Sequence, residues 1–243
     1  MLQDRGHGLV SILIPAYKES EHIEATLSGL VEAFRSRNFR FEIIVVIDVV
    51  PEDLTSTHVA RASAIYGEIR SVVRNGRRGV GDAIQTAIKL AAGEAVIIVM
   101  GDQSEEPGDV IHLAETVENY DLVFTNRFKR GRPHGYPPLK YVANRMCNAA
   151  AKLLFHIPYS DITNAFKAYR TEIISDAAIS ANGFEVFLEL PIKAIKSARR
   201  TTEIEVKHFV RKKKLAKLSV IRDGYRYVLL LCSLLRTERV GRP

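Results

Sequence analysis

The sequence is poor in cysteine and has no long apolar run. Its two cysteines, Cys147 and Cys232, lack the paired spacing of a zinc site, which argues against a zinc centre or a disulfide framework and favours a reducing compartment. A membrane-spanning helix needs roughly 20 apolar residues, and the longest candidate, residues 227–235, is much shorter. The first residues also lack the basic-then-apolar order of a secretory signal. We therefore expect a cytoplasmic protein.

Two common phosphate-binding signatures are missing as well. The sequence contains no Gly-Lys-Ser/Thr phosphate loop, and Ile84 stands where the dinucleotide fingerprint, which Gly79 and Gly81 would begin, needs its third glycine. Aromatic stacking motifs and a recognition-helix signature are absent, so we expect no nucleic-acid partner. The net charge of +7 nevertheless indicates an anionic partner, such as a nucleotide or a phospholipid surface.

The chain is long and apolar enough to fold around one large core, with 243 residues of which 47% are hydrophobic and 26% charged. Strand-like runs alternate with segments of helical periodicity in the first half, at residues 9–14, 41–47, 69–73, 95–100 and 122–125. This alternation predicts an α/β fold with a mostly parallel sheet flanked by helices.

The second half of the chain has a different organisation. A basic, Gly- and Pro-rich connection at residues 129–138 predicts a mobile loop. Beyond it we predict helices at 139–155, 184–197 and 218–235, a polar segment at 161–170 and a strand at 201–209. The last helix is amphipathic, and its apolar stripe is expected to pack on the chain's own core, on a second subunit or on a membrane.

Three carboxylates, Asp102, Glu105 and Glu106, follow the apolar strand at residues 95–100. The carboxyl ends of strands are where open α/β sheets bind ligands, and carboxylate oxygens are the ligands of hard cations. The sequence therefore predicts a magnesium or manganese ion at this point, holding a diphosphate.

Polar residues and glycines also follow the other predicted strands. Pro15 is expected to stop the first strand, and Glu19 to complement the dipole of the next helix. Asp48 ends the second strand, where it would either accept hydrogen bonds from a nucleobase or cap the following loop. Gly79 and Gly81 open the helix after the third strand, where backbone amides can approach an anion.

The order of these residues resembles that of a known family. Pro-x-Tyr-x-Glu after the first strand, Asp after the second, Arg and Gly-x-Gly after the third and acids after the fourth are similar to the pattern of the inverting family 2 glycosyltransferases of the GT-A fold. Within that family, the chain most resembles the dolichol-phosphate mannosyltransferases and their bacterial polyprenyl-phosphate relatives. The resemblance covers residues 10–219.

Motifs in the second half support this narrower resemblance. The run Asp-Ile-Thr-Asn-Ala-Phe-Lys-Ala-Tyr-Arg at residues 161–170 is similar to the group's Asp-x-Thr-Ser-Gly-Phe-Arg-x-Tyr-Arg. Residues 183–189 are similar to its Gly-Phe-Glu-Phe-x-x-Glu, and Arg211 with residues 217–219 resembles its basic ending.

The chain departs from the family at two places. Residues 47–50 keep one acid where the family has Asp-Asp-Gly-Ser, which bears on the selection of base or ribose. Gly101 and Gln103 flank Asp102, so the usual Asp-x-Asp metal motif is absent. We match residues 101–107 to the variant pattern Ala-Asp-Gly-Ser-Asp-Asp-Pro, in which Asp102 is the main metal or diphosphate ligand.

The resemblance implies roles for individual residues. Catalytic roles are expected for Asp102, Arg127, Asp161 and Lys167. Donor binding is expected for Pro15, Tyr17, Glu19, Asp48, Arg74, Gly79, Gly81, Asp102, Gln103, Arg211 and Lys217. The metal ion, Mg²⁺ or Mn²⁺, is expected at Asp102, Glu105 and Glu106. Residues 1–126 would form the nucleotide-sugar-binding half of a single domain, 127–217 its acceptor-side half and 218–243 the C-terminal helix.

The implied activity is metal-dependent transfer of a hexose, of mannose or glucose type, from a GDP- or UDP-sugar to dolichyl or undecaprenyl phosphate. A lipid monophosphate needs no general base, because its second pKa of about 6 leaves it largely dianionic at neutral pH. Two alternatives stay open: transfer to a soluble or polysaccharide hydroxyl, with Asp161, Glu185 or Glu189 as the base, and a catalytically silent nucleotide-sugar-binding subunit. We also expect contact with the cytoplasmic face of a membrane, and either a homodimer or a membrane partner protein.

Overall fold

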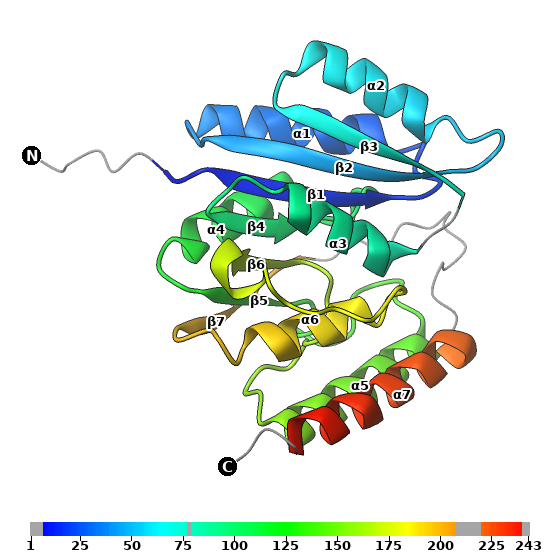
Figure 1. Cartoon of the computed structure of the whole chain (residues 1–243), viewed down its shortest axis with the longest axis vertical. Helices are drawn as coiled ribbons and strands as arrows, with labels where there is room; N and C mark the ends of the chain where they lie inside the picture. The colour runs from blue at the N-terminus through cyan, green and yellow to red at the C-terminus, as the bar shows by residue number, and fades with distance from the viewer. Residues whose placement is uncertain (1–6, 77–78, 208–219, 240–243) are drawn as a thin grey trace, which may run out of the picture.

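The predicted α/β fold is confirmed. The computed structural model describes residues 7–76, 79–207 and 220–239, which form one seven-stranded sheet with helices on both faces (Figure 1). The strands are β1 (Val10–Ala16), β2 (Phe41–Val49), β3 (Ile69–Asn75), β4 (Ala95–Ile98), β5 (Leu122–Asn126), β6 (Lys167–Arg170) and β7 (Thr201–Glu205). The helices are α1 (Ile23–Ser36), α2 (Thr55–Ile65), α3 (Val80–Leu90), α4 (Pro107–Val117), α5 (Pro138–Phe155), α6 (Val186–Ala194) and α7 (Val220–Arg239), with a short 3-10 turn at Thr171–Ile173.

The sheet is mostly parallel, as predicted. Its strand order is β3-β2-β1-β4-β6-β5-β7, and every neighbouring pair is parallel except those that β6 makes with β4 and β5. The carboxyl ends of β1 to β4 therefore lie along one edge of the sheet, where ligands bind in open α/β folds.

Strand β6 was not predicted, because residues 161–170 form a polar segment in the sequence. The structure inserts this segment between β4 and β5 and buries Lys167 and Tyr169 completely. Helices α2 and α4 lie between predicted strands, where the alternation predicts helical segments, although their bounds were not given. The predicted strand at 201–209 ends earlier, at Glu205, and residues 208 and 209 lie outside the described part of the chain.

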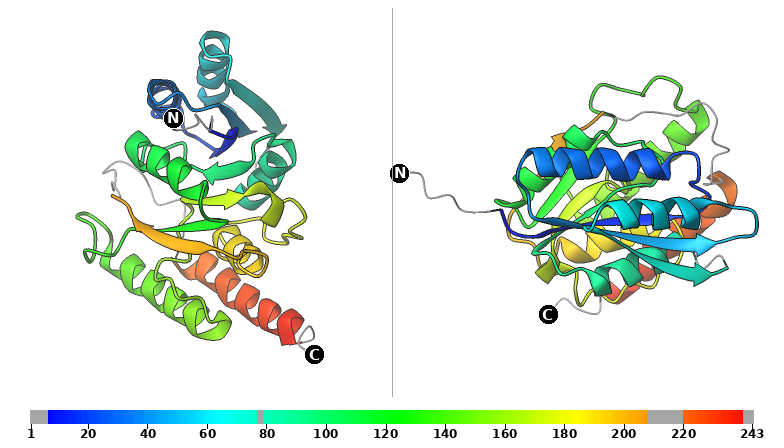
Figure 2. Two further views of the ribbon diagram at one scale, coloured as in Figure 1. Left: turned by 90° about the vertical axis from the view of Figure 1, so that its left-hand side faces the viewer. Right: turned by 90° about the horizontal axis from the view of Figure 1, so that it is seen from above.

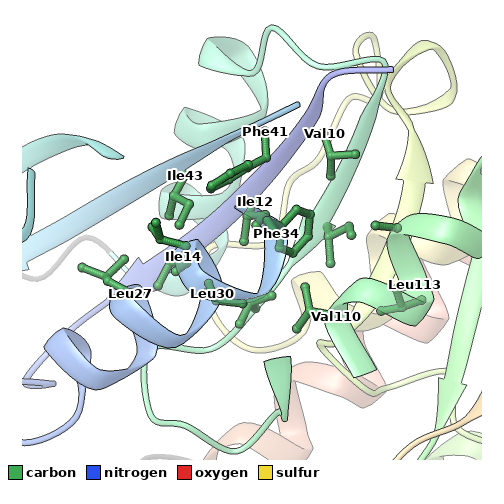
Figure 3. Close-up of a cluster of buried hydrophobic side chains, with 14 of the residues drawn as sticks. Val10, Ile12, Ile14, Leu27, Leu30, Phe34, Phe41, Ile43, Val110 and Leu113 are labelled. Atoms are coloured by element: carbon green, nitrogen blue, oxygen red, sulfur yellow. The ribbon is translucent and has the colours of Figure 1, made fainter. Parts of the chain in front are cut away.

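Successive side chains along each strand point to opposite faces of the sheet and belong to two apolar cores, one on each face. Ile12 and Ile14 of β1 face the core under α1, α2 and α4, whereas Leu13 faces the core under α3 and α6. Figure 3 shows Leu27 and Phe34 of α1 directed onto the first of these layers. Both faces of the sheet are therefore covered by helices.

Helices α5 and α7 lie side by side, beyond the β7 end of the sheet (Figures 1 and 2). Among the α7 residues whose burial the structure describes, Leu230, Leu231 and Leu234 are buried, whereas Tyr225 and Val228 are exposed. Helix α7 therefore packs on the chain's own core through these leucines, while Tyr225 and Val228 lie outside that contact. None of the described helices combines the length and the apolar character needed to cross a bilayer.

Candidate active site

The first cluster joins the ends of β2 and β3 to the start of α3. The Arg74 guanidinium is nearly buried, and its Nε lies 2.8 Å from Oδ1 of Asp48, to which Nη2 also donates. Its Nη1 donates to Oδ2 of Asp82 at 2.5 Å, and the Gly79 amide donates to Oδ2 of Asp48 at 3.1 Å. Asp48 and Arg74, two of the predicted donor residues, thus form a buried ion pair, and donor binding by them stays a prediction.

The two glycines of the Gly-x-Gly turn make close backbone contacts. Gly79 has a φ of +101°, which side chains rarely adopt, and a Cβ there would lie 2.3 Å from the Asn182 carbonyl oxygen. A Cβ on Gly81 would lie 2.1 Å from the Ala181 carbonyl oxygen. The Gly81 amide donates to the Asn182 oxygen at 2.9 Å, so this amide does not face a ligand in this structure. Donor binding by the two glycines stays a prediction.

The end of β1 differs from its prediction in detail. Pro15 does not stop the strand, because β1 continues to Ala16 and Pro15 pairs in register with Val46. Its missing N–H is tolerated because pairing with β4 ends at Leu13. Glu19 lies ahead of α1 rather than in its first turn. Its side chain is buried against the Asp102 loop, where a Cβ on Gly101 would be 3.3 Å from Glu19 Cγ.

The remaining predicted donor residues lie around this edge. Tyr17 is half-buried just after β1. Gln103 is half-buried in the acidic loop and has a left-handed φ of 58°. Arg211 and Lys217 lie outside the described residues.

The acidic loop after β4 brings two carboxylates to one hydroxyl. Ser104 Oγ donates to Oδ1 of Asp102 at 2.5 Å and lies 3.0 Å from Oε1 of Glu105. Burial, together with the charge of Asp102, raises the pKa of Glu105 to about 8. The two carboxylates therefore interact unfavourably when both are ionised.

Glu106 is separated from this pair. Its Oε2 lies 3.7 Å from Nζ of Lys207 rather than at the Ser104 hydroxyl, although Glu105 and Glu106 both line one cavity of about 280 Å³ beside α1. Within residues 7–76, 79–207 and 220–239, no three acid, histidine or cysteine side chains are placed to hold a metal ion together. The predicted set of three metal-binding acids is therefore not assembled in the structure.

A buried ion pair lies at the end of β5. Arg127 donates from Nε to Oδ2 of Asp161 at 2.8 Å and from Nη2 to Oδ1 at 2.9 Å, and its backbone amide also donates to Oδ2. Burial disfavours ionisation of Asp161, but the Arg127 charge prevails and lowers the pKa of the Asp161 carboxyl. The charges of Arg127 and Glu105 also interact, so the basic and acidic groups share one region.

Lys167 lies beneath this pair and does not reach the surface. Its side chain is completely buried, and Nζ donates to the Asn164 carbonyl oxygen. Burial, aided by the charge of Arg127, lowers the pKa of Lys167 to about 7 against the opposing effect of Asp161. Lys167 therefore cannot contact a substrate directly in this structure.

Lys140 is not among the site residues predicted from the sequence. Unlike the completely buried Lys167, Lys140 is partly exposed and so can contact a substrate. It lies half-buried in the first turn of α5, and burial together with Arg127 lowers its pKa, whereas Asp102 acts in the opposite direction. Lys140 is thus close enough to both Asp102 and Arg127 for their charges to act on it. The Nζ atom of Lys140 lies 5.7 Å from the centre of the Tyr136 ring. Tyr136 is buried and packs edge-on against Phe128. The prolines that start α5 are the only sequence signal for this placement.

The three acids considered as bases differ in their surroundings. Asp161 is held by Arg127, and Glu189 is completely buried with both oxygens bonded to residues 180 and 181. Glu185 keeps one oxygen, Oε2, that is buried without a hydrogen-bond partner among the described residues. Of the three, only Glu185 has a carboxylate oxygen free of such contacts.

Residues 11–177 match the family model Glycosyl transferase family 2. An undecaprenyl-phosphate 4-deoxy-4-formamido-L-arabinose transferase of Aeromonas hydrophila is 31% identical over 202 residues, which cover 82% of this chain and 60% of that protein. The protein of the same name from Yersinia pestis is 30% identical over 227 residues, covering 92% and 67%. The chain thus spans only about three fifths to two thirds of the length of these relatives.

Solved structures with the same fold include a glucosyl-3-phosphoglycerate synthase of M. tuberculosis, with a TM-score of 0.71 and 17% identity over 93% of this chain and 81% of that one. Its complex with Mn²⁺, uridine diphosphate and glucosyl-3-phosphoglycerate also gives a TM-score of 0.71, at 18% identity over 93% and 80%. At these identities the likeness concerns the GT-A fold alone.

Proposed function

The chain belongs to Glycosyl transferase family 2, and from this we propose that it transfers a hexose-type sugar from a UDP- or GDP-sugar to a polyprenyl phosphate. The observation that carries the proposal is the identity of 30% and 31% to two undecaprenyl-phosphate sugar transferases. The acidic loop and the basic cluster at one edge of the sheet supply the charges that such a transfer needs.

The donor would lie along the carboxyl ends of β1 to β4. The Asp48–Arg74 pair is rigid because both side chains are buried and share several hydrogen bonds, which suits recognition of the nucleoside. Asp102 lies on the neighbouring strand end, where the diphosphate would follow.

Asp102 and Glu105 would hold the divalent cation. Magnesium is commonly bound by one or two carboxylates, with substrate phosphates and water completing its shell, so a pair of acids suffices. A bound ion would offset the negative charge that grows on the departing nucleoside diphosphate. Mn²⁺ in the complex of the synthase with the same fold supports this choice of ion.

The acceptor phosphate would lie between Lys140 and Arg127. One of its oxygens attacks the anomeric carbon while the bond from that carbon to the diphosphate oxygen breaks, with inversion. A dianionic phosphate carries no proton on the attacking oxygen, so no side chain has to act as a base. The work of the protein is to orient two anions and stabilise their charge.

The surface of α5 supports docking on a membrane that carries the acceptor. Leu139, Val142, Met146 and Leu153 are exposed, and their spacing places them on one face of the helix. Helix α5 also contains three basic residues and no acidic residue, which suits an anionic lipid surface. Because Lys140 belongs to the same helix, docking would bring the bilayer next to the site.

The proposal is tested with vesicles that contain undecaprenyl phosphate and a panel of radiolabelled UDP- and GDP-hexoses. We expect label to enter the lipid extract only when the lipid carries its phosphate, so vesicles with undecaprenol, the same lipid without phosphate, are the matched control. Transfer to undecaprenol or to soluble sugars, but not to undecaprenyl phosphate, would instead support a hydroxyl acceptor, with Glu185 as its base. Donor binding without any transfer would support the silent subunit.

A further inference from the structure

A buried carboxylate of α6 holds a loop that belongs to neither the donor residues nor the acceptor residues described above. Glu189 is completely buried. Its oxygens accept hydrogen bonds from the Ser180 amide at 3.0 Å, the Ser180 hydroxyl at 2.8 Å and the Ala181 amide at 2.7 Å. Lys193, one turn further along α6, lies 2.5 Å from the same carboxylate. This cluster fixes the backbone at residues 180–181.

Residues 181 and 182 of that loop pack directly against the Gly-x-Gly turn. The carbonyl oxygens of Ala181 and Asn182 stand so close to Gly81 and Gly79 that neither position has room for a Cβ. The Gly81 amide donates to Asn182 at 2.9 Å. A shift of the loop would therefore move the start of α3 with it.

The other side of the turn contacts the donor end. The Gly79 amide donates to Asp48 at 3.1 Å, and its carbonyl oxygen lies 3.3 Å from Nη2 of Arg74. Asp82, in the first turn of α3, accepts a hydrogen bond from Nη1 of the same arginine. The turn at Gly79 thus lies between the loop held by Glu189 and the Asp48–Arg74 pair.

We propose that Glu189 is a positioning residue, which sets the geometry of the donor end through residues 180–182 and the Gly79–Gly81 turn. It contacts none of the donor groups itself. The hydroxyl-acceptor alternative named Glu189 as one of three candidate bases, but the hydrogen bonds of its carboxylate are to residues 180, 181 and 193 of the protein itself. The link to donor affinity rests on the proposed function, whereas the link to the turn does not.

The test compares Glu189→Gln with Asp121→Asn in the full chain. Asp121 is a matched control because its carboxylate also accepts two backbone amides, those of Arg199 and Arg200 at 2.7 and 2.8 Å, far from the turn. Hydrogen exchange at the Gly81 amide reports on the turn. We expect Glu189→Gln to speed this exchange about 10-fold and Asp121→Asn to leave it unchanged. Unchanged exchange in a folded Glu189→Gln protein would overturn the proposal.

A second arm measures binding of uridine diphosphate and guanosine diphosphate in the presence of Mn²⁺ by calorimetry. Glu189→Gln should weaken binding about 10-fold. A combined Glu189→Gln, Gly81→Ala protein should bind little more weakly than the weaker-binding of the two single variants, because both act through one turn. Additive losses would contradict this route. Absence of nucleotide binding in the wild type would refute the proposed function, while the exchange result would still decide the role of Glu189.

Ser180→Ala tests the same contact if the Glu189→Gln protein fails to fold. It removes only the hydroxyl bond to Glu189 and keeps both backbone amide bonds. We expect a change in the same direction, about 2-fold, in the exchange of the Gly81 amide. No change in this variant, together with an unfolded Glu189→Gln protein, would assign Glu189 a role in folding alone and overturn the proposal.

Discussion

Arg127 donates two side-chain hydrogen bonds to Asp161, which lies 34 positions further along the chain. The Asp161 side chain is 0% exposed and that of Arg127 is 12% exposed. The pair ties the end of β5 to the segment that leads into β6, so the basic side of the site is built by a contact between distant parts of the chain.

Breaking this pair should destabilise the protein strongly. Asp161→Asn leaves the Arg127 charge buried without its partner, which costs about 3–5 kcal/mol. Urea unfolding measures the loss. Glu68→Gln is the control, because the Glu68 pair with Arg35 is more exposed and such pairs contribute less than about 1 kcal/mol. Equal losses in the two variants would show that the buried pair is not the stabilising contact described above.

The acids of the loop after β4 should differ in importance. Asp102→Asn should lower kcat/KM at least about 100-fold and remove the response to Mn²⁺. Glu106→Gln should have a much smaller effect, because Glu106 faces Lys207 rather than the Ser104 hydroxyl. Activity titrated with MnCl₂ measures both. Similar losses would restore Glu106 to the cation site from which the structure separates it.

The buried Lys167 should make stability depend on pH. Its pKa is about 7 in the folded protein and about 10.4 in an unfolded chain, so between these values unfolding takes up a proton. The free energy of unfolding of the wild type should therefore rise, relative to Lys167→Met, by up to about 1.4 kcal/mol per pH unit in this window.

Urea unfolding of both proteins at several pH values between about 7 and about 9 measures this difference. Lys89→Met, which changes an exposed lysine of α3, should run parallel to the wild type. A constant difference between the wild type and Lys167→Met would mean that Lys167 keeps an ordinary pKa.

The exposed face of α5 should bind anionic vesicles. Met146 and Leu153 are 68% and 74% exposed, and placing a carboxylate at each opposes insertion beside lipid phosphates. The Met146→Glu, Leu153→Glu protein should bind vesicles at least about 10-fold more weakly than the wild type in flotation assays. Leu54→Glu together with Ile65→Glu, on exposed apolar residues of α2 and its N-cap, should bind as the wild type does. An equal loss in both proteins would indicate a general effect of charge.

The donor side of the site could be read from the sequence because it depends on local order. Asp48, Arg74 and the Gly-x-Gly turn each directly follow or end a strand, and parallel strands align their carboxyl ends. Apolar runs separated by helical segments located these strands. The sequence therefore placed the groups at one edge, although not the bonds between them.

The acceptor side was harder to predict because it depends on contacts between distant segments. The insertion of β6 buries Lys167, and the position of α5 brings Lys140 toward Asp102. Neither follows from periodicity or motif spacing, since each is fixed by how loops return to the sheet. The separation of Glu106 from Asp102 is similar, because it depends on how the loop turns into α4.

The most direct test of the account is phosphorus NMR of a reaction that contains the protein, Mn²⁺, a nucleotide sugar from the panel and undecaprenyl phosphate in detergent. The account predicts that the phosphate monoester signal of the lipid is replaced by a phosphodiester signal, with one nucleoside diphosphate released for each lipid converted. A lipid signal that stays a monoester while nucleoside diphosphate accumulates would contradict it, because the sugar would then have gone to water or to a hydroxyl.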